Sequence, residues 1–262
     1  MKRINPIRLT AAFLACIWSW PLQAATVKDG LILHLDAAEQ VREGGLSPTN
    51  STWRNLAGSP DTIAGNGTLH GISSSASAGW TGIGSSESPY ALRLDGHQSY
   101  VTGPGNLELP ALTLEAWAEV EGNTLRGATL IGNDFGKGGI SLLIQAASQS
   151  PILLHEVTFT PVDAETPVGQ WHQFVATIKD GTACIYVDGV QQATLPAPRK
   201  LQPDHYPAWQ LGVARHPENN FVEADGLIGS LAIVRVYNRA LLPAEVAANF
   251  QADKSRFPIS AA

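Results

Sequence analysis

Two Asp-Gly pairs set between strand-like segments constrain the fold of this chain more than any other feature. Asp180-Gly181 and Asp188-Gly189 separate three apolar segments, Trp171–Ile178, Cys184–Val187 and Val190–Thr194. Asp-Gly accepts the positive φ angles of a type I′ turn, and the twist of that turn matches the twist of the flanking strands. The two pairs therefore predict a meander of three consecutive antiparallel strands.

Further strand-like segments recur along the chain and indicate the fold class. They are Leu31–Asp36, Ala91–Leu94, Leu112–Val120, Thr129–Ile131, Ile140–Ile144, Ile152–Val157, Trp209–Val213 and Leu227–Tyr237. Residues 40–90 are rich in Gly, Ser and Asn, with Trp53 and Trp80 as isolated anchors. Pro243 opens the one helix that we expect, in which Val246 and Phe250 share an inward face. The pattern predicts an all-β, two-sheet antiparallel sandwich with one short C-terminal helix.

The first residues have the pattern of an export signal. Lys2, Arg3 and Arg8 precede an apolar stretch from Leu9 to Leu22, and small residues follow at 24–25. The apolar stretch is shorter than the roughly 20 residues that a spanning helix needs. We expect residues 1–24 to be a signal peptide and residues 25–262 to form one domain, secreted or periplasmic and not membrane-spanning. Lipidation at Cys16 is the alternative.

Charge and cysteine content narrow the class of protein further. The net charge is −6 and the sequence pI is about 5.6, and the chain has no basic cluster of the kind that binds nucleic acid. Cleavage after residue 24 leaves Cys184 as the single cysteine, so stability must come from packing. Its apolar strand context predicts a buried side chain rather than a reactive thiol.

Several motifs occur together in one order along the chain. They are Gly30-Leu31, Trp53-Arg54-Asn55-Leu56-Ala57-Gly58, Leu94-Asp95-Gly96, Leu112-Thr113-Leu114-Glu115-Ala116-Trp117, Trp171-His172, Tyr186-Val187-Asp188-Gly189 and Val236-Tyr237-Asn238-Arg239-Ala240-Leu241. This set resembles laminin-G-like jelly-roll domains of the concanavalin A-like lectin and glucanase superfamily. The resemblance covers roughly residues 29–250 and implies that the sandwich is a jelly roll.

Most of the motif residues have a structural interpretation. We expect Trp117 and Trp171 to fill the core, and the hydroxyl groups of Tyr186 and Tyr237 to be hydrogen-bonded at the sheet edge. Arg239 is expected to pair with Glu245 and to close the helix without a ligand.

The resemblance also implies a structural calcium beside the last strand. In the family an Asp in a Gly-x-Ile-Asp pattern holds the ion, whereas this chain reads Gly229-Ser230-Leu231-Ala232. Alanine supplies no anionic oxygen, which is the ligand that Ca²⁺ prefers. Asp29 and Asp225 are the candidate replacements. We expect no cofactor to be required, with calcium as an optional ligand.

Catalytic signatures are weak in this sequence. The superfamily includes glycosidases with a Glu-x-Asp-x-x-Glu string, which this chain lacks. Glu115 and Glu119 share one strand face, but at about 3.3 Å per residue they lie roughly 13 Å apart, beyond the range of retaining or inverting pairs. The candidate lyase residues His155, His172 and Tyr206 form no recognisable string with an Arg. The sequence therefore favours a protein without an active site.

A ligand site is best sought among aromatic and planar polar side chains on loops. The candidates are Tyr206, His216, Asn219 and Asn220, with Asp134 nearby. Other loop aromatics are Trp80, Trp209 and a cluster of His97, Gln98 and Tyr100, for which packing on the sandwich edge is the competing interpretation. The expected function is an exported non-catalytic module that binds glycans or a cell-surface protein. The alternatives are a polysaccharide lyase or glycosidase with an unfamiliar site, and an adhesive or structural surface protein.

Overall fold

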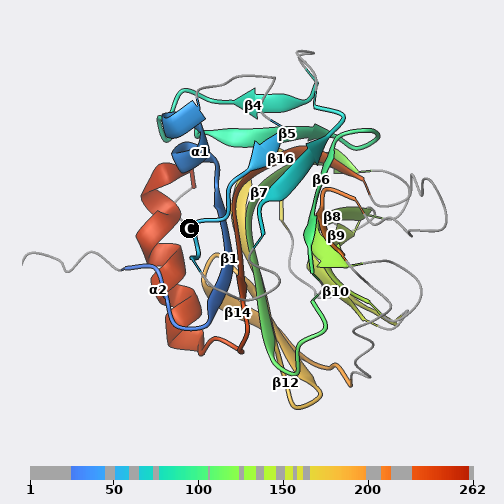
Figure 1. Ribbon diagram of the computed structural model, residues 1–262. Coiled ribbons are helices and arrows are strands. Elements are labelled where there is room, and N and C mark those ends of the chain that lie inside the picture. Colours follow the sequence, from blue (N-terminus) through green and yellow to red (C-terminus); the bar gives the residue numbers. More distant parts are fainter. Residues whose placement is uncertain are drawn as a thin grey trace, which may run out of the picture.

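The protein is a sandwich of two antiparallel sheets with a helix packed on one outer face (Figure 1). This computed structural model describes residues 25–44, 51–58, 65–72, 77–105, 107–123, 127–133, 139–145, 151–155, 158–161, 166–198, 208–213 and 226–259. The predicted fold class is confirmed.

The first sheet has eight strands in the order β14-β13-β12-β7-β16-β5-β4, with β1 also paired to β16. Their bounds are β1 Leu31–Asp36, β4 Gly79–Thr81, β5 Ala91–Asp95, β7 Leu112–Asn123, β12 Trp171–Lys179, β13 Thr182–Val187, β14 Val190–Pro196 and β16 Leu227–Tyr237. The central strands β7 and β16 are the longest and hold the sheet together through a shared ladder.

The second sheet also has eight strands, in the order β11-β10-β9-β8-β15-β6-β3-β2. Their bounds are β2 Thr52–Trp53, β3 Gly67–His70, β6 Tyr100–Pro104, β8 Gly127–Asn133, β9 Ile140–Gln145, β10 Pro151–His155, β11 Thr158–Pro161 and β15 Ala208–Leu211. The chain crosses between the sheets several times, so that some neighbouring strands, such as β7 and β16 or β15 and β6, are distant in sequence.

The predicted meander is confirmed as β12, β13 and β14. Asp180 and Asp188 both have φ of 50°, and the following glycines Gly181 and Gly189 have φ of 72° and 76°. Positive φ at both central residues defines the type I′ turn that the Asp-Gly pairs predict.

The helices are α1 Ala37–Gly44, α2 Pro243–Asp253 and a 3₁₀ turn, η3 Lys254–Arg256. The predicted C-terminal helix is confirmed, and its Pro243 is the first helical residue. The expectation of a single helix is wrong, because α1 follows β1 directly. The Asp36 side chain accepts a hydrogen bond from the Ala38 backbone N–H at 2.9 Å and caps this helix.

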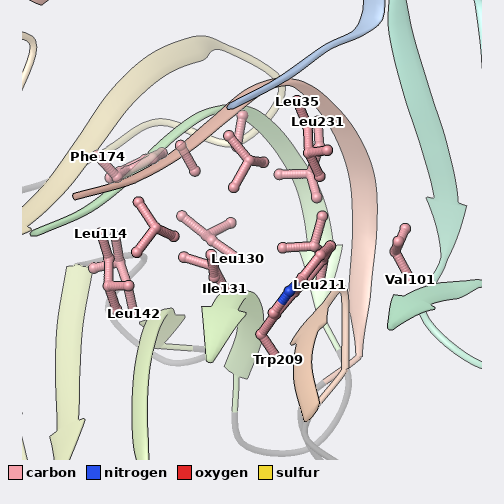
Figure 2. Packing of buried hydrophobic residues seen from close by; sticks show 14 of the residues in the cluster. Leu35, Val101, Leu114, Leu130, Ile131, Leu142, Phe174, Trp209, Leu211 and Leu231 are labelled. Atoms are coloured by element: carbon pink, nitrogen blue, oxygen red, sulfur yellow. The ribbon is translucent and has the colours of Figure 1, made fainter. Parts of the chain in front are cut away.

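The core lies between the sheets (Figure 2). Leu35, Leu114 and Phe174 of the first sheet face Leu130 and Trp209 of the second, and these side chains are at most 1% exposed. Trp209 is therefore a core residue. Among the described residues, no helix has the length and apolar character needed to cross a bilayer.

Residues 40–90 contribute more regular structure than their composition predicts. Strands β2, β3 and β4 lie there, and Trp53 and Trp80 pack edge to face with ring centroids 5.2 Å apart. Both tryptophans are buried, which confirms their role as anchors and removes Trp80 from the candidate ligand contacts.

Candidate functional site

The outer face of the second sheet carries uncharged polar side chains that we call the outer platform: Thr68, His70, Tyr100, Thr102 and Gln210. Side chains alternate between the two faces of a strand. Leu69, Val101 and Leu211 belong to the inter-sheet core, so the platform residues beside them in β3, β6 and β15 lie on the opposite face.

Register brings the platform residues side by side. Thr68 pairs with Thr102, which pairs with Gln210, and His70 pairs with Tyr100. The His70 and Tyr100 rings stack with centroids 4.4 Å apart and planes 10° from parallel. His70 Nε2 lies 2.8 Å from Thr102 Oγ1, within hydrogen-bond distance. These contacts fix the orientation of the aromatic pair relative to the neighbouring hydroxyl group.

The platform is open to solvent at one end and buried at the other. Thr68 is exposed, Tyr100 is partly exposed, and Gln210 is 9% exposed. The row continues through Gly132 to Ser141, which is 1% exposed. A side chain at Gly132 would bring its Cβ within 1.9 Å of Ser141 Oγ, so only glycine leaves space for the serine.

This arrangement suits a hydroxyl-rich ligand. Aromatic rings offer apolar surface, while hydroxyl, amide and imidazole groups donate and accept hydrogen bonds that orient a bound molecule. The open end of the outer platform, around Thr68, Tyr100 and Thr102, is therefore the candidate binding surface.

Sequence reasoning placed the ligand site elsewhere. Its candidates, Tyr206, His216, Asn219, Asn220 and Asp134, lie outside the described residues, so that assignment stays a prediction. Of the cluster His97, Gln98 and Tyr100, only Tyr100 lies in the outer platform.

His97 and Gln98 form a turn instead. Their backbone N–H groups donate to Asp95 Oδ1 at 2.9 and 3.0 Å. His70, Thr102 and Gln210 were not among the residues predicted from sequence. The alternation of polar and apolar residues in 67–70 and 100–102 is the pattern that could have placed His70 and Thr102 on one face of a strand.

The described residues do not fit the family's calcium site. Ala232, at the position of the family Asp, is fully buried and packs in an apolar cluster with Trp117 and Phe257. Asp29 Oδ2 lies 2.9 Å from Arg239 Nε and is thus paired with a cation. In the described part of the chain, no three His, Cys, Asp or Glu side chains gather into a metal site. Asp225 lies outside it, so its role as a ligand stays a prediction.

The outer face of the first sheet holds a buried charge cluster. Arg235 Nη1 lies 2.8 Å from Glu115 Oε1 and 2.7 Å from Asp253 Oδ2. Asn249 of α2 donates to Glu115 Oε2 at 2.7 Å and to the Tyr237 hydroxyl at 2.9 Å. Burial lowers the pKa of Arg235, but the charges of Glu115 and Asp253 outweigh it and raise that pKa above its usual value. The cluster ties α2 to the sheet.

The two glutamates considered as a catalytic pair, Glu115 and Glu119, lie in different surroundings. Glu115 is fully buried and paired with Arg235. Glu119 lies apart from it, and burial together with the nearby charge of Glu121 raises the Glu119 pKa. Arg93 pairs with Glu121. Glu115 therefore has a structural role beneath α2.

Other structural expectations are confirmed. Arg239 pairs with Glu245 through contacts of 2.8 and 2.7 Å. The Tyr237 hydroxyl is hydrogen-bonded to Asn249 and to the Val27 carbonyl. Trp117 and Trp171 are buried core residues, as expected. They pack with Phe257 beneath the C-terminal segment, on the outer face of the first sheet.

Solved structures with the same fold cover most of this chain. Domain 4 of a GH43 extracellular arabinanase from Geobacillus stearothermophilus, in complex with arabinotriose, aligns with a TM-score of 0.61 and 19% identity over 83% of this chain and 96% of that chain. Trypanosoma rangeli sialidase in complex with sialic acid aligns with a TM-score of 0.60 and 17% identity over 88% of this chain and 34% of that chain.

A third similar structure is the binding domain of botulinum neurotoxin serotype D/C. It aligns with a TM-score of 0.57 and 12% identity over 85% of this chain and 52% of that chain. At these identities the likeness concerns the fold alone. No curated protein sequence gives a significant match.

A family model described as the concanavalin A-like lectin/glucanases superfamily matches residues 94–247, more than half of the chain. The matched region includes strands of both sheets and the start of α2. The chain therefore belongs to the concanavalin A-like lectin/glucanase superfamily.

Proposed function

We propose that this protein is an exported, non-catalytic module that binds glycans through the outer platform. The observation that carries the proposal is the stacked His70–Tyr100 pair, held beside the Thr102 hydroxyl on the outer face of the second sheet. An aromatic surface flanked by hydroxyl and amide groups matches the alternating apolar and hydroxyl surfaces of a sugar ring. Membership of a superfamily of lectins and glucanases supports the same ligand class.

The first ligands to test follow from the similar structures. One is a domain of an arabinanase bound to arabinotriose, and another is a sialidase bound to sialic acid. A glycan array that includes both sugars therefore samples the relevant chemistry, followed by calorimetric titration of the glycans that bind.

Replacement of Tyr100 by Ala tests the surface. Because the ring supplies aromatic contact area, we expect Tyr100→Ala to weaken glycan binding by about tenfold or more, which corresponds to roughly 1.4 kcal/mol. Gln192→Ala is the control, since Gln192 is exposed on β14 of the other sheet. Equal affinity of the Tyr100 variant and the control would reject the outer platform as the binding surface.

The same titrations test the loop residues that were predicted from sequence to bind the ligand. Tyr206→Ala combined with Asn219→Ala weakens binding if these side chains contribute to the site. Unchanged affinity would remove them from it. Repeating the titration with a chelator tests the optional calcium ion, whose loss lowers affinity only if the ion takes part in binding.

Export is proposed on the sequence pattern of residues 1–24. Mass spectrometry of the protein recovered from culture medium or periplasm measures the new N-terminus. Cleavage near Ala24 agrees with a signal peptide, whereas a lipidated Cys16 at the N-terminus supports the anchored alternative.

A further inference from the structure

Charged residues are distributed unequally between the two sheets. None of the eight described strands of the second sheet contains Asp, Glu, Lys or Arg. In the first sheet, β1, β5, β7, β12 and β16 each contain at least one of these residues. Charged residues make up 15% of the whole chain, so the strands of the second sheet are poorer in charged residues than the rest of the sequence.

Two buried charges of the first sheet, Arg235 and Asp36, form ion pairs that hold the fold together. Arg235 pairs with Glu115, and Arg256 of η3 contacts Asp36 through both of its terminal nitrogens at 2.7 Å. The polar groups of the outer platform, in contrast, are hydroxyl, amide, imidazole and phenol groups. The two outer faces thus differ in chemistry, with Arg and Glu side chains on the helix-covered face and no Asp, Glu, Lys or Arg in the strands of the other sheet.

This difference bears on which sugars the outer platform can hold. Neutral hydroxyl groups of a sugar exchange hydrogen bonds with Thr, Gln and Tyr side chains at little desolvation cost. A carboxylate or sulfate group on a sugar loses hydration on binding and needs a cationic partner, usually Arg or Lys, to compensate. The net charge of −6 also repels polyanions at long range.

We propose that the outer platform selects uncharged glycans over anionic ones, an inference that rests on the proposed glycan-binding function. The ligand class is a neutral oligosaccharide such as an arabinan or xylan fragment. Acidic sugars, including sialylated and uronic acid oligosaccharides, are rejected because the strands of the second sheet contain no Lys or Arg to pair with a carboxylate.

The test compares neutral and anionic ligands of similar length on the mature protein, residues 25–262. Arabinotriose and xylotriose are the neutral probes, and sialyllactose and trigalacturonate are the anionic probes, in calorimetric titrations. We expect the best neutral probe to bind with a Kd at least about tenfold below that of either anionic probe. Its affinity is expected to change little between about 50 and about 500 mM salt, because screening acts only on charged partners.

Two outcomes separate this inference from the proposed function. Binding of an anionic probe as tightly as the neutral probes, with an affinity that falls steeply with salt, overturns the selectivity while leaving glycan binding in place. Binding of none of these probes, together with a blank glycan array, overturns the proposed function itself.

A gain-of-function variant locates the selectivity on the platform. Thr68 is exposed in the short strand β3, so Thr68→Lys introduces a cation without disturbing the core. We expect this variant to bind trigalacturonate at least about threefold more tightly than the wild type, so that the ratio of its trigalacturonate affinity to its arabinotriose affinity rises. The control is Gln192→Lys on β14, which adds the same charge to the other sheet. Equal gains in the two variants would show that net charge, and not the platform, sets the preference.

Discussion

Arg235 lies among buried carboxylates where the first sheet meets α2. Its side chain is 1% exposed and contacts Glu115 and Asp253. Arg235→Ala leaves the buried Glu115 without its cation and leaves Asp253 with only Arg256, at 3.7 Å, so we expect the free energy of unfolding to fall by about 3–5 kcal/mol. Urea denaturation measures the loss.

The matched control for this variant is Arg42→Ala. The Arg42 side chain is 70% exposed and pairs with Glu39 within one helix, so its removal should change the free energy of unfolding by less than about 0.5 kcal/mol. A loss below about 1 kcal/mol for Arg235→Ala would contradict a structural role for the cluster.

His34 gives the protein a pH-dependent stability. It pairs with Arg235 across β1 and β16, and burial, followed by the charge of Arg235, lowers its pKa from 6.5 to about 3. Between these two values the unfolded chain binds a proton that the folded chain excludes. The stability contributed by neutral His34 is therefore complete above pH 6.5 and is lost as the pH falls toward 3.

Unfolding curves of the wild type and of His34→Gln from pH 7 to pH 4 measure this contribution. The wild type should lose up to about 1.4 kcal/mol per pH unit from this group below its unfolded pKa, and the variant should lack that slope. His97→Gln, at an exposed turn position, is the control and should keep the wild-type slope. Parallel curves for the wild type and His34→Gln would contradict the assignment.

The Asp36 carboxyl group also makes stability depend on pH, but at lower pH than His34 does. Burial raises the pKa of its carboxyl group, but the Arg256 guanidinium more than offsets this and lowers that pKa below the usual 3.8. Its contribution is present above pH 3.8 and is lost as the pH falls through the lower folded value. The losses from His34 and Asp36 thus occur mainly in successive pH ranges.

At the scale of elements, the turn between β13 and β14 also positions the C-terminal helix. Gly189 has φ of 76°, and a Cβ placed on it would approach the Phe250 Cβ of α2 to 3.0 Å. Gly169 has a similar φ of 73° but no atom within 4 Å of such a Cβ. Replacing either glycine strains the backbone, but only at Gly189 would the added Cβ also contact α2.

Comparing Gly189→Ala with Gly169→Ala therefore separates backbone strain from helix contact. Each variant should lose about 1 kcal/mol for the left-handed conformation, and Gly189→Ala should lose about 1 kcal/mol more by displacing α2. Thermal unfolding of both variants measures the difference. Equal losses would mean that α2 moves aside without cost.

Elements with strong local signals were predictable from sequence. The β12–β14 meander follows from its Asp-Gly turns, and α2 follows from Pro243 and its inward face. The short strands β2, β3 and β4 were not predictable from sequence, because each has at most four residues and depends on pairing with other strands. Helix α1 was missed although Asp36 precedes it as a cap.

At the scale of the whole molecule, the two sheets share one apolar core. Leu33 and Leu94 of the first sheet belong to the same cluster as Val101 and Leu211 of the second. Because neither sheet can bury its inner face alone, we expect one cooperative unfolding transition, with circular dichroism and tryptophan fluorescence curves that coincide. Two separate transitions would contradict the predicted single domain over residues 25–262.

The sequence by itself determined the class of fold, the meander and the C-terminal helix, because turn geometry and side-chain periodicity depend on residues close together in the chain. Only the tertiary structure decided that Trp117 packs beneath the C-terminal segment rather than between the sheets. It also decided that Glu115 pairs with Arg235, and that His70 stacks on Tyr100. These contacts join strands distant in sequence, and their partners are set by the order and register of the strands, which local patterns do not specify.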